Sequence, residues 1–187
     1  MSRSERLRLS SVVFAVLFTQ LLVYPGVDRL VAALGGEPTI DAGTAFLAVQ
    51  LLAFVLFSAV WGALSDRFGR RLPFIVIGAL GGTVAYLALA ALVLAGVGDF
   101  RTALALRFVE GAFAIGAFSL SITMLMDLDG GHGRNMGAAG IAIGAGAALG
   151  APVGGALYAF GPLAPILVSA ALLSVVAVVI STLPDRT

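Results

Sequence analysis

"WGALSDRFGRRLPF", residues 61–74, separates two long apolar runs and is the most densely charged stretch near the middle of the chain. Between Gly62 and Gly69 it places Asp66 and Arg67, and Arg70 and Arg71 follow directly. A simple connection between two apolar helices needs neither the acid nor the glycines. The stretch therefore predicts a hairpin between two membrane helices, which is either a solvated loop with an orienting charge or a working part.

The composition of the 187 residues is that of a membrane protein. Hydrophobic residues make up 60% of the chain, charged residues make up 11%, and the mean hydropathy is +1.07. A soluble domain has about 25% charged residues, so this chain cannot cover a water-facing surface. At about 20 residues for each transmembrane helix, the length allows six spans. The expected fold class is therefore all-α, a single six-helix membrane domain over residues 1–187.

The composition also excludes several kinds of site. The chain has no cysteine, which excludes disulfides and thiol chemistry, and its one histidine cannot form a multi-histidine metal cluster. An intramembrane protease needs a histidine within the membrane, but His132 falls in a predicted loop. We expect no enzyme activity, no catalytic residue, no metal and no cofactor. The net charge of +1 is spread over loops, so no nucleic-acid partner is expected.

Apolar runs predict helices near residues 10–33, 43–64, 73–98, 101–126, 136–160 and 162–183. The first is interpreted as an uncleaved helix because its apolar run is long and five spans follow it. Basic residues favour cytoplasmic loops, which places both termini in the cytoplasm of a multi-pass protein of the plasma or inner membrane. In that orientation only Arg29 and Arg101 lie outside, and the inner side holds Arg3, Arg6, Arg8, Arg67, Arg70, Arg71, Arg134 and Arg186.

Two ionisable residues, Arg107 and Glu110, lie well inside a predicted span. A charge near the bilayer centre costs about 2.5–3.5 kcal/mol on insertion scales. Their spacing of three residues makes them neighbours on one helix face, where they can offset each other. Ala114, Ala117 and Ser121 continue this face and indicate the wall of a polar cavity. Two interpretations remain open, a substrate or proton path and a structural ion pair buried between helices.

Milder polar residues are Gln20 and Tyr24 in the first predicted helix and Gln50 in the second. Each is a candidate to line the same path, and each alone equally suits an ordinary interhelical hydrogen bond.

The fifth predicted helix carries a stripe of small residues, which indicates close approach of another helix. The stripe consists of Gly137, Gly140, Gly144, Ala147, Ala151 and Gly154. Pro152, with Gly154 and Gly155, predicts a kink or a pliable point there.

Four stretches resemble motifs of the major facilitator superfamily, three of them closely. The stretch from Gly62 to Arg71 is similar to the signature G-x-x-x-D-R-x-G-R-R/K between the second and third helices of that family. "RFVEG", residues 107–111, looks like its R-x-x-x-G motif in helix four. "GAPVGG", residues 150–155, is similar to the G-P-x-x-G-G motif of proton-driven exporters, but it has one residue too few between proline and glycine. "LLVYPGV", residues 21–27, loosely resembles the end of helix one in exporter-type members.

This resemblance covers essentially the whole chain but only the N-terminal half of the family's fold, which has twelve helices in two six-helix halves. It implies that Asp66 faces a helix N-terminus in the other half, and that Arg70 pairs with an acid closing helix four, for which Asp127 is the candidate. Gly62 and Gly69 then permit close approach and the tight turn. Together these residues would form a gating latch.

A latch of this kind needs a second half. We expect this chain to pair with a second copy of itself or with a different half, with Asp66 of one copy facing Arg134 of the other. A separated fragment of a twelve-helix transporter is the rival interpretation. The resulting prediction is a secondary active transporter for a small organic solute or drug, proton-coupled through Glu110 and Arg107, with one motif that is similar to those of efflux proteins. A non-transporting membrane subunit or scaffold is the alternative.

Overall fold

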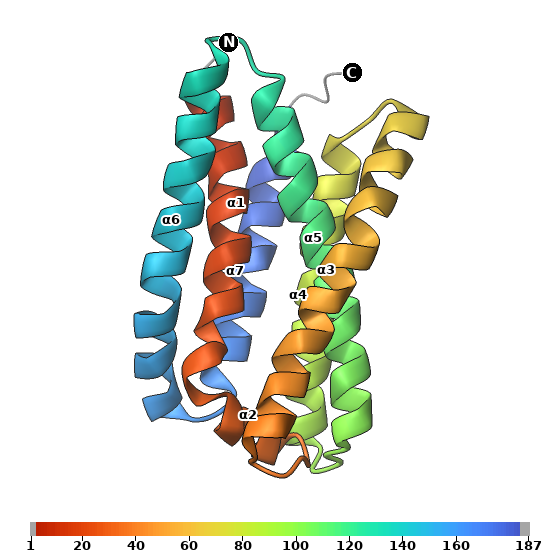
Figure 1. Ribbon diagram of the computed structural model, residues 1–187, viewed down its shortest axis with the longest axis vertical. Coiled ribbons are helices and arrows are strands. Elements are labelled where there is room, and N and C mark those ends of the chain that lie inside the picture. The colour runs from red at the N-terminus through yellow and green to blue at the C-terminus, as the bar shows by residue number, and fades with distance from the viewer. Residues whose placement is uncertain (1–2, 184–187) are drawn as a thin grey trace.

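The computed structural model describes residues 3–183, which form a bundle of helices without any strand (Figure 1). Its elements are α1 (Arg3–Leu22), η1 (Tyr24–Gly26), α2 (Val27–Ala33), α3 (Ile40–Phe68), α4 (Leu72–Leu94), α5 (Phe100–Met126), α6 (His132–Leu157), η2 (Tyr158–Phe160) and α7 (Ala164–Ser181). Six segments are long and apolar enough to cross a membrane, and α1, η1 and α2 together form the first of them. The predicted all-α fold with six transmembrane helices is confirmed.

Particular residues determine where several helices begin or break. Pro25 lies in the short 3-10 turn that joins α1 to α2, because proline has no backbone N–H for the helical ladder. Thr39 caps α3, and its hydroxyl accepts a hydrogen bond from the N–H of Ala42 at 3.2 Å. Asp99 caps α5 in the same way. Hydrogen bonds from the Thr102 hydroxyl and N–H hold the pKa of the Asp99 carboxyl below its usual range.

Helix α3 is longer than its apolar run. It continues to Phe68, so that Asp66 and Arg67 belong to its last turn. Gly69 then adopts φ +62°, a left-handed conformation that glycine reaches without strain and that commonly ends helices. Only residues 69–71 connect α3 to α4. The charged stretch is therefore mostly a helix end, and the loop itself is short.

The six crossings form two layers (Figure 1). α6 lies beside α1, α5 lies on the other side of α1 with α3 crossing diagonally over it, and α7 and α4 lie behind this front layer. α1 packs on α6, α7 and α5, and α5 packs in addition on α4 and α3. The outer helices of the front layer have few other neighbours, so only 17% of the span in α3 and 22% of that in α6 is buried, against 44–61% in the rest. The outer sides of α3 and α6 are therefore not covered by other helices of the bundle.

Helix α1 begins and α7 ends at the same end of the bundle (Figure 1). We call it the Arg-rich end, because its described residues include Arg3, Arg6, Arg8, Arg67, Arg70, Arg71 and Arg134. The opposite end carries Arg29 and Arg101. The sequence predicts that the Arg-rich end faces the cytoplasm.

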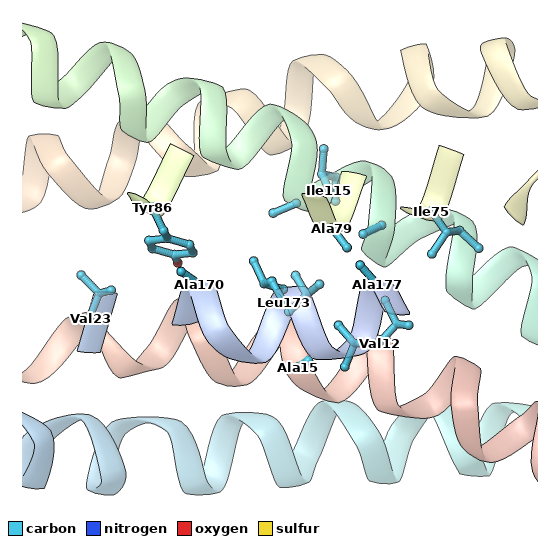
Figure 2. Close-up of a cluster of buried hydrophobic side chains, with 14 of the residues drawn as sticks. Val12, Ala15, Val23, Ile75, Ala79, Tyr86, Ile115, Ala170, Leu173 and Ala177 are labelled. Carbon is cyan, nitrogen blue, oxygen red and sulfur yellow. The ribbon is translucent and has the colours of Figure 1, made fainter. Parts of the chain in front are cut away.

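Helix α7 fills the space between α1 and α4 (Figure 2). Ala170, Leu173 and Ala177 point from α7 into a buried cluster, where the ring of Tyr86 on α4 lies against Ala170. Leu173 and Tyr86 are fully buried. This packing fixes the position of Tyr86, whose hydroxyl reaches the polar site described below.

Glycines allow α6 to lie directly on α1. A Cβ atom added to Gly146 or Gly150 would sit 2.8 Å from the carbonyl oxygen of Phe14 or 2.9 Å from that of Phe18. The next glycine of this row, Gly154, meets the backbone of α1 even more closely. These three glycines are spaced by four residues, which is the spacing of close helix pairs in membranes.

The small-residue stripe predicted from the sequence follows a different face of α6. Gly137, Gly140 and Gly144 have no described atom within 4 Å of an added Cβ, whereas Gly154 lies in the contact with α1. Steps of four residues advance by more than one turn, so the contact face winds around the helix. The predicted stripe follows alternating steps of three and four, so it diverges from the contact row and shares only Gly154 with it. Pro152, the predicted kink position, lies inside the continuous helix α6.

Candidate functional site

An ion pair between Arg107 and Glu110 of α5 is buried inside the bundle. Nη1 of Arg107 lies 3.1 Å from Oε2 of Glu110, and both side chains have 0% exposure. Two charges removed from water lose hydration that their mutual attraction repays only when the geometry is good and further hydrogen bonds are present. The pair therefore depends on partners from other helices.

Gln20 of α1 supplies two of these hydrogen bonds. Its Nε2 donates to Oε1 of Glu110 at 3.0 Å, and its Oε1 accepts from Nη2 of Arg107 at 3.3 Å. One amide thus satisfies both members of the ion pair at once. Gln20 itself is 4% exposed, so this contact between α1 and α5 is shielded from solvent.

Tyr86 and Phe46 enclose the guanidinium from the other sides. The Tyr86 hydroxyl of α4 accepts from Nη1 of Arg107 at 3.1 Å. The guanidinium carbon lies 5.3 Å from the ring centre of Phe46 on α3 and 5.6 Å from that of Tyr86, within the range of cation–π attraction. Four helices, α1, α3, α4 and α5, therefore meet around one arginine. We call Gln20, Phe46, Tyr86, Arg107 and Glu110 the central cluster.

The predicted path residues fall in different places. Gln20 belongs to the central cluster, and Gln50 is buried beside it at the contact of α3 with α5. Tyr24 begins η1 and is half-buried. The face of α5 that was expected to line a polar cavity is packed in this conformation: Ala114, Ala117 and Ser121 each have 0% exposure.

Sequence reasoning missed Tyr86 and Phe46. Tyr86 carries a polar tip within an otherwise apolar helix, and this signal was available in "GTVAYLAL", residues 82–89. Phe46 carried no signal, because a phenylalanine in a membrane helix is ordinary. Its role depends on the way α3 faces α5.

The gating-motif residues lie at the Arg-rich end. Asp66, Arg67 and Gly69 are exposed, and a Cβ added to Gly62 would meet no described atom within 4 Å. Arg71 forms an ion pair with Asp127, the residue that closes α5.

The resemblance implied Arg70 as the partner of Asp127, but the structure places its neighbour Arg71 there. Arg71 directly precedes α4, and α4 packs along α5 in the opposite direction, so this arginine lies beside the end of α5. The side chains are 29% and 59% exposed. Water screens such a pair, so its contribution to stability is small.

A second polar contact at the Arg-rich end was not anticipated. Nε of Arg6 donates to Oδ1 of Asn135 at 2.9 Å, and its Nη2 donates to the carbonyl oxygen of Asp129 at 3.2 Å. Nδ2 of Asn135, which is fully buried, donates to the carbonyl oxygen of Leu128 at 2.6 Å. The start of α1 is thereby tied to the connection between α5 and α6.

Helices that enclose an ion pair at mid-membrane depth are typical of membrane transport proteins. The family model of the Major Facilitator Superfamily matches residues 9–187. The chain therefore belongs to the major facilitator superfamily, whose members are membrane transporters, and its six helices correspond to half of that fold. The search of curated proteins returned no match.

Proposed function

We propose that the chain is a secondary active transporter of a small organic solute, coupled to protons through Glu110. The enclosed Arg107–Glu110 pair carries this proposal. Replacing a buried ion pair by apolar residues of similar volume is often neutral or stabilising, so folding alone gives little reason to keep one. Ionisable groups within the membrane are by default functional, and a carboxylate that gains and loses a proton suits coupling.

The solute path is proposed to run along the front layer, past Gln20, Tyr24 and Gln50. Gln20 of α1 belongs to the central cluster, Gln50 is buried on α3, and Tyr24 is half-buried in η1. If the front layer of this six-helix unit packs against the front layer of a second unit, the proposed path lies between these two front layers. The plasma or inner membrane is the proposed location.

The test is flux into proteoliposomes with and without an imposed pH gradient, with a panel of fluorescent organic cations and anions as probes. Glu110→Gln should abolish the gradient-driven part of the flux while the protein stays folded. Glu37→Gln is the matched control, since Glu37 is exposed in the connection before α3. Undiminished coupling in Glu110→Gln removes Glu110 from the mechanism.

We further propose that the working unit is a dimer of two copies of this chain, related by a two-fold axis along the membrane normal. Turning two front layers towards each other sets α3 of one copy against α6 of the other. Asp66 is exposed at the end of α3, and Arg134 is exposed in the first turn of α6. These opposite charges lie at the same end of the bundle, and a carboxylate also gains from the N-terminus of α6.

Cysteine crosslinking tests the dimer, because the chain has no cysteine of its own. Membranes containing both Asp66→Cys and Arg134→Cys copies should give a crosslinked dimer, whereas Val84→Cys, on the exposed side of α4 in the back layer, should not. If no crosslink forms between copies and native mass spectrometry finds only monomer, the homodimer is wrong. Pairing with a different six-helix half is then the remaining proposal.

A further inference from the structure

Two buried polar atoms beside the ion pair are unpaired within the described part of the chain. They are Nε of Arg107 and Oε1 of Gln50. The first is a hydrogen-bond donor and the second is an acceptor. Their residues are 0% and 1% exposed. Buried polar groups are nearly always paired, so a complementary donor and acceptor left open in one region need a reason.

Both residues face the contact between α3 and α5. The guanidinium carbon of Arg107 lies 5.3 Å from the ring centre of Phe46, which is one turn before Gln50 on α3. Gly111 is one turn after Arg107 on α5, and a Cβ added to it would sit 2.9 Å from Cγ of Gln50. The absent side chain of Gly111 thus leaves room for Gln50 in the contact of α3 with α5, which the guanidinium also faces through Phe46.

We propose that Gln50 is the alternative acceptor to which Arg107 turns when Glu110 is protonated. This inference rests on the proposed function, in which Glu110 takes up a proton. In the structure the carboxylate of Glu110 holds Nη1 of Arg107. Once a proton from the aqueous path binds Oε2, the carboxyl group is neutral and holds the guanidinium less strongly. Arg107 keeps its own proton and charge, and its open N–H turns to the carbonyl oxygen of Gln50.

As a consequence, protonation of Glu110 changes which helices are hydrogen-bonded to Arg107. With Glu110 charged, Arg107 is bonded to Gln20 of α1 and Tyr86 of α4. With Glu110 protonated, Arg107 is bonded to Gln50 of α3. Helix α3 is the least buried crossing and packs mainly on α5, so a new bond across this contact can change its position. Gln50 is therefore a positioning residue that converts protonation into a shift of α3.

The groups around Glu110 come from every helix that encloses it. Tyr86 faces it from α4, and Arg107 lies beside it on α5. The uncharged amides of Gln20 and Gln50 come from α1 and α3. Tyr24 and Tyr158 lie within electrostatic range of Arg107, and on α7 the hydroxyl of Ser169 donates to the carbonyl oxygen of Thr19 at 3.5 Å.

Infrared difference spectroscopy of the reconstituted full chain tests the switch, because it reads protonation of a carboxyl group without requiring transport. The band of Glu110 is the one that Glu110→Gln removes. Gln50→Leu removes the alternative acceptor and should move the pH midpoint of this band down by about one unit. A merely structural role predicts the opposite direction, since less polar surroundings favour the neutral carboxyl form.

Gln50→Glu should move the midpoint up, because it offers Arg107 a stronger acceptor; its new band is assigned in the Gln50→Glu, Glu110→Gln double variant. Ser58→Ala, elsewhere on α3, should leave the midpoint unchanged. A Gln50→Leu midpoint that stays or rises overturns the switch. Where that variant does not fold, an unmoved midpoint in Gln50→Glu overturns it.

Failure of the switch and failure of the proposed function give different results. Coupled flux that survives Glu110→Gln refutes the proposed function. Coupled flux that needs Glu110, together with midpoints that Gln50 does not control, refutes only the switch. A Glu110 band that does not titrate in the unmodified protein refutes both.

Discussion

Arg107 is enclosed by residues from three other helices, Gln20, Phe46 and Tyr86. The spacing of Arg107 and Glu110 on one helix was enough to predict that they pair, because residues three apart are neighbours on any α-helix. Which residues of other helices meet them depends on how those helices are rotated about their own axes. Nearly uniform apolar helices leave that rotation undetermined, so the sequence marks Tyr86 as a polar group within α4 but does not assign it, or Phe46, to the ion pair.

Tyr86→Phe should destabilise the protein although it removes only one oxygen. The Tyr86 hydroxyl accepts from Nη1 of Arg107, and its loss leaves the buried cation with one partner fewer. We expect the free energy of unfolding in detergent to fall by roughly 1–2 kcal/mol. Tyr24→Phe, at a half-buried position, should change it by less than about 0.5 kcal/mol. Equal effects of both variants would show that the Tyr86 hydroxyl adds nothing to the cluster.

The spacing of small residues in α6 is not enough to predict which face of this helix contacts α1. The many glycines and alanines in α6 predict a close contact with another helix, and α6 does pack closely on α1. The contact with α1 uses a row at steps of four, whereas the predicted stripe follows alternating steps of three and four, and both rows are present in the sequence. The crossing angle of the two helices decides between the rows, and that angle is a property of the pair.

Alanine substitutions on the two faces of α6 should have opposite effects. Gly150→Ala places a Cβ against the backbone of α1 and should lower the free energy of unfolding by about 1–3 kcal/mol. Gly140→Ala meets open space and should raise it by up to about 1 kcal/mol, since alanine favours helix over glycine. Thermal unfolding of both variants in the same detergent makes the comparison. A stabilised Gly150→Ala variant would contradict the described contact.

The start of α5 depends on pH through Asp99. Its cap is made by the charged carboxylate, and its pKa is lower in the folded protein than in the unfolded chain. The cap therefore stabilises the fold fully above the unfolded pKa of about 3.9, and this contribution is lost as the pH falls through the folded value. Asp99→Asn keeps a capping oxygen and should lose this pH dependence. If Asp99 had no such role, the free energy of unfolding would change by the same amount between neutral and acidic pH in Asp99→Asn and in the original protein.

At the scale of the molecule, the six crossings follow from apolar runs of the right length, and this part of the prediction is confirmed. Family membership follows from the motif around Asp66 and is confirmed by the match over residues 9–187. The order of the helices in space was beyond local sequence reasoning, because it is set by contacts between distant segments such as α1 with α6. That order explains why α3 and α6 are open on their outer sides, and it supplies the geometry of the proposed dimer.

In the proposed function, the Arg107–Glu110 pair is kept for transport and is not required for folding. The most direct measurement is the combined stability and proton-coupled flux of the double variant Arg107→Met, Glu110→Leu, which replaces the buried pair by apolar side chains of similar size. We predict a protein as stable as the original or more so, with gradient-driven flux abolished. A stable double variant that still transports with full proton coupling would contradict the claim and favour a purely structural ion pair.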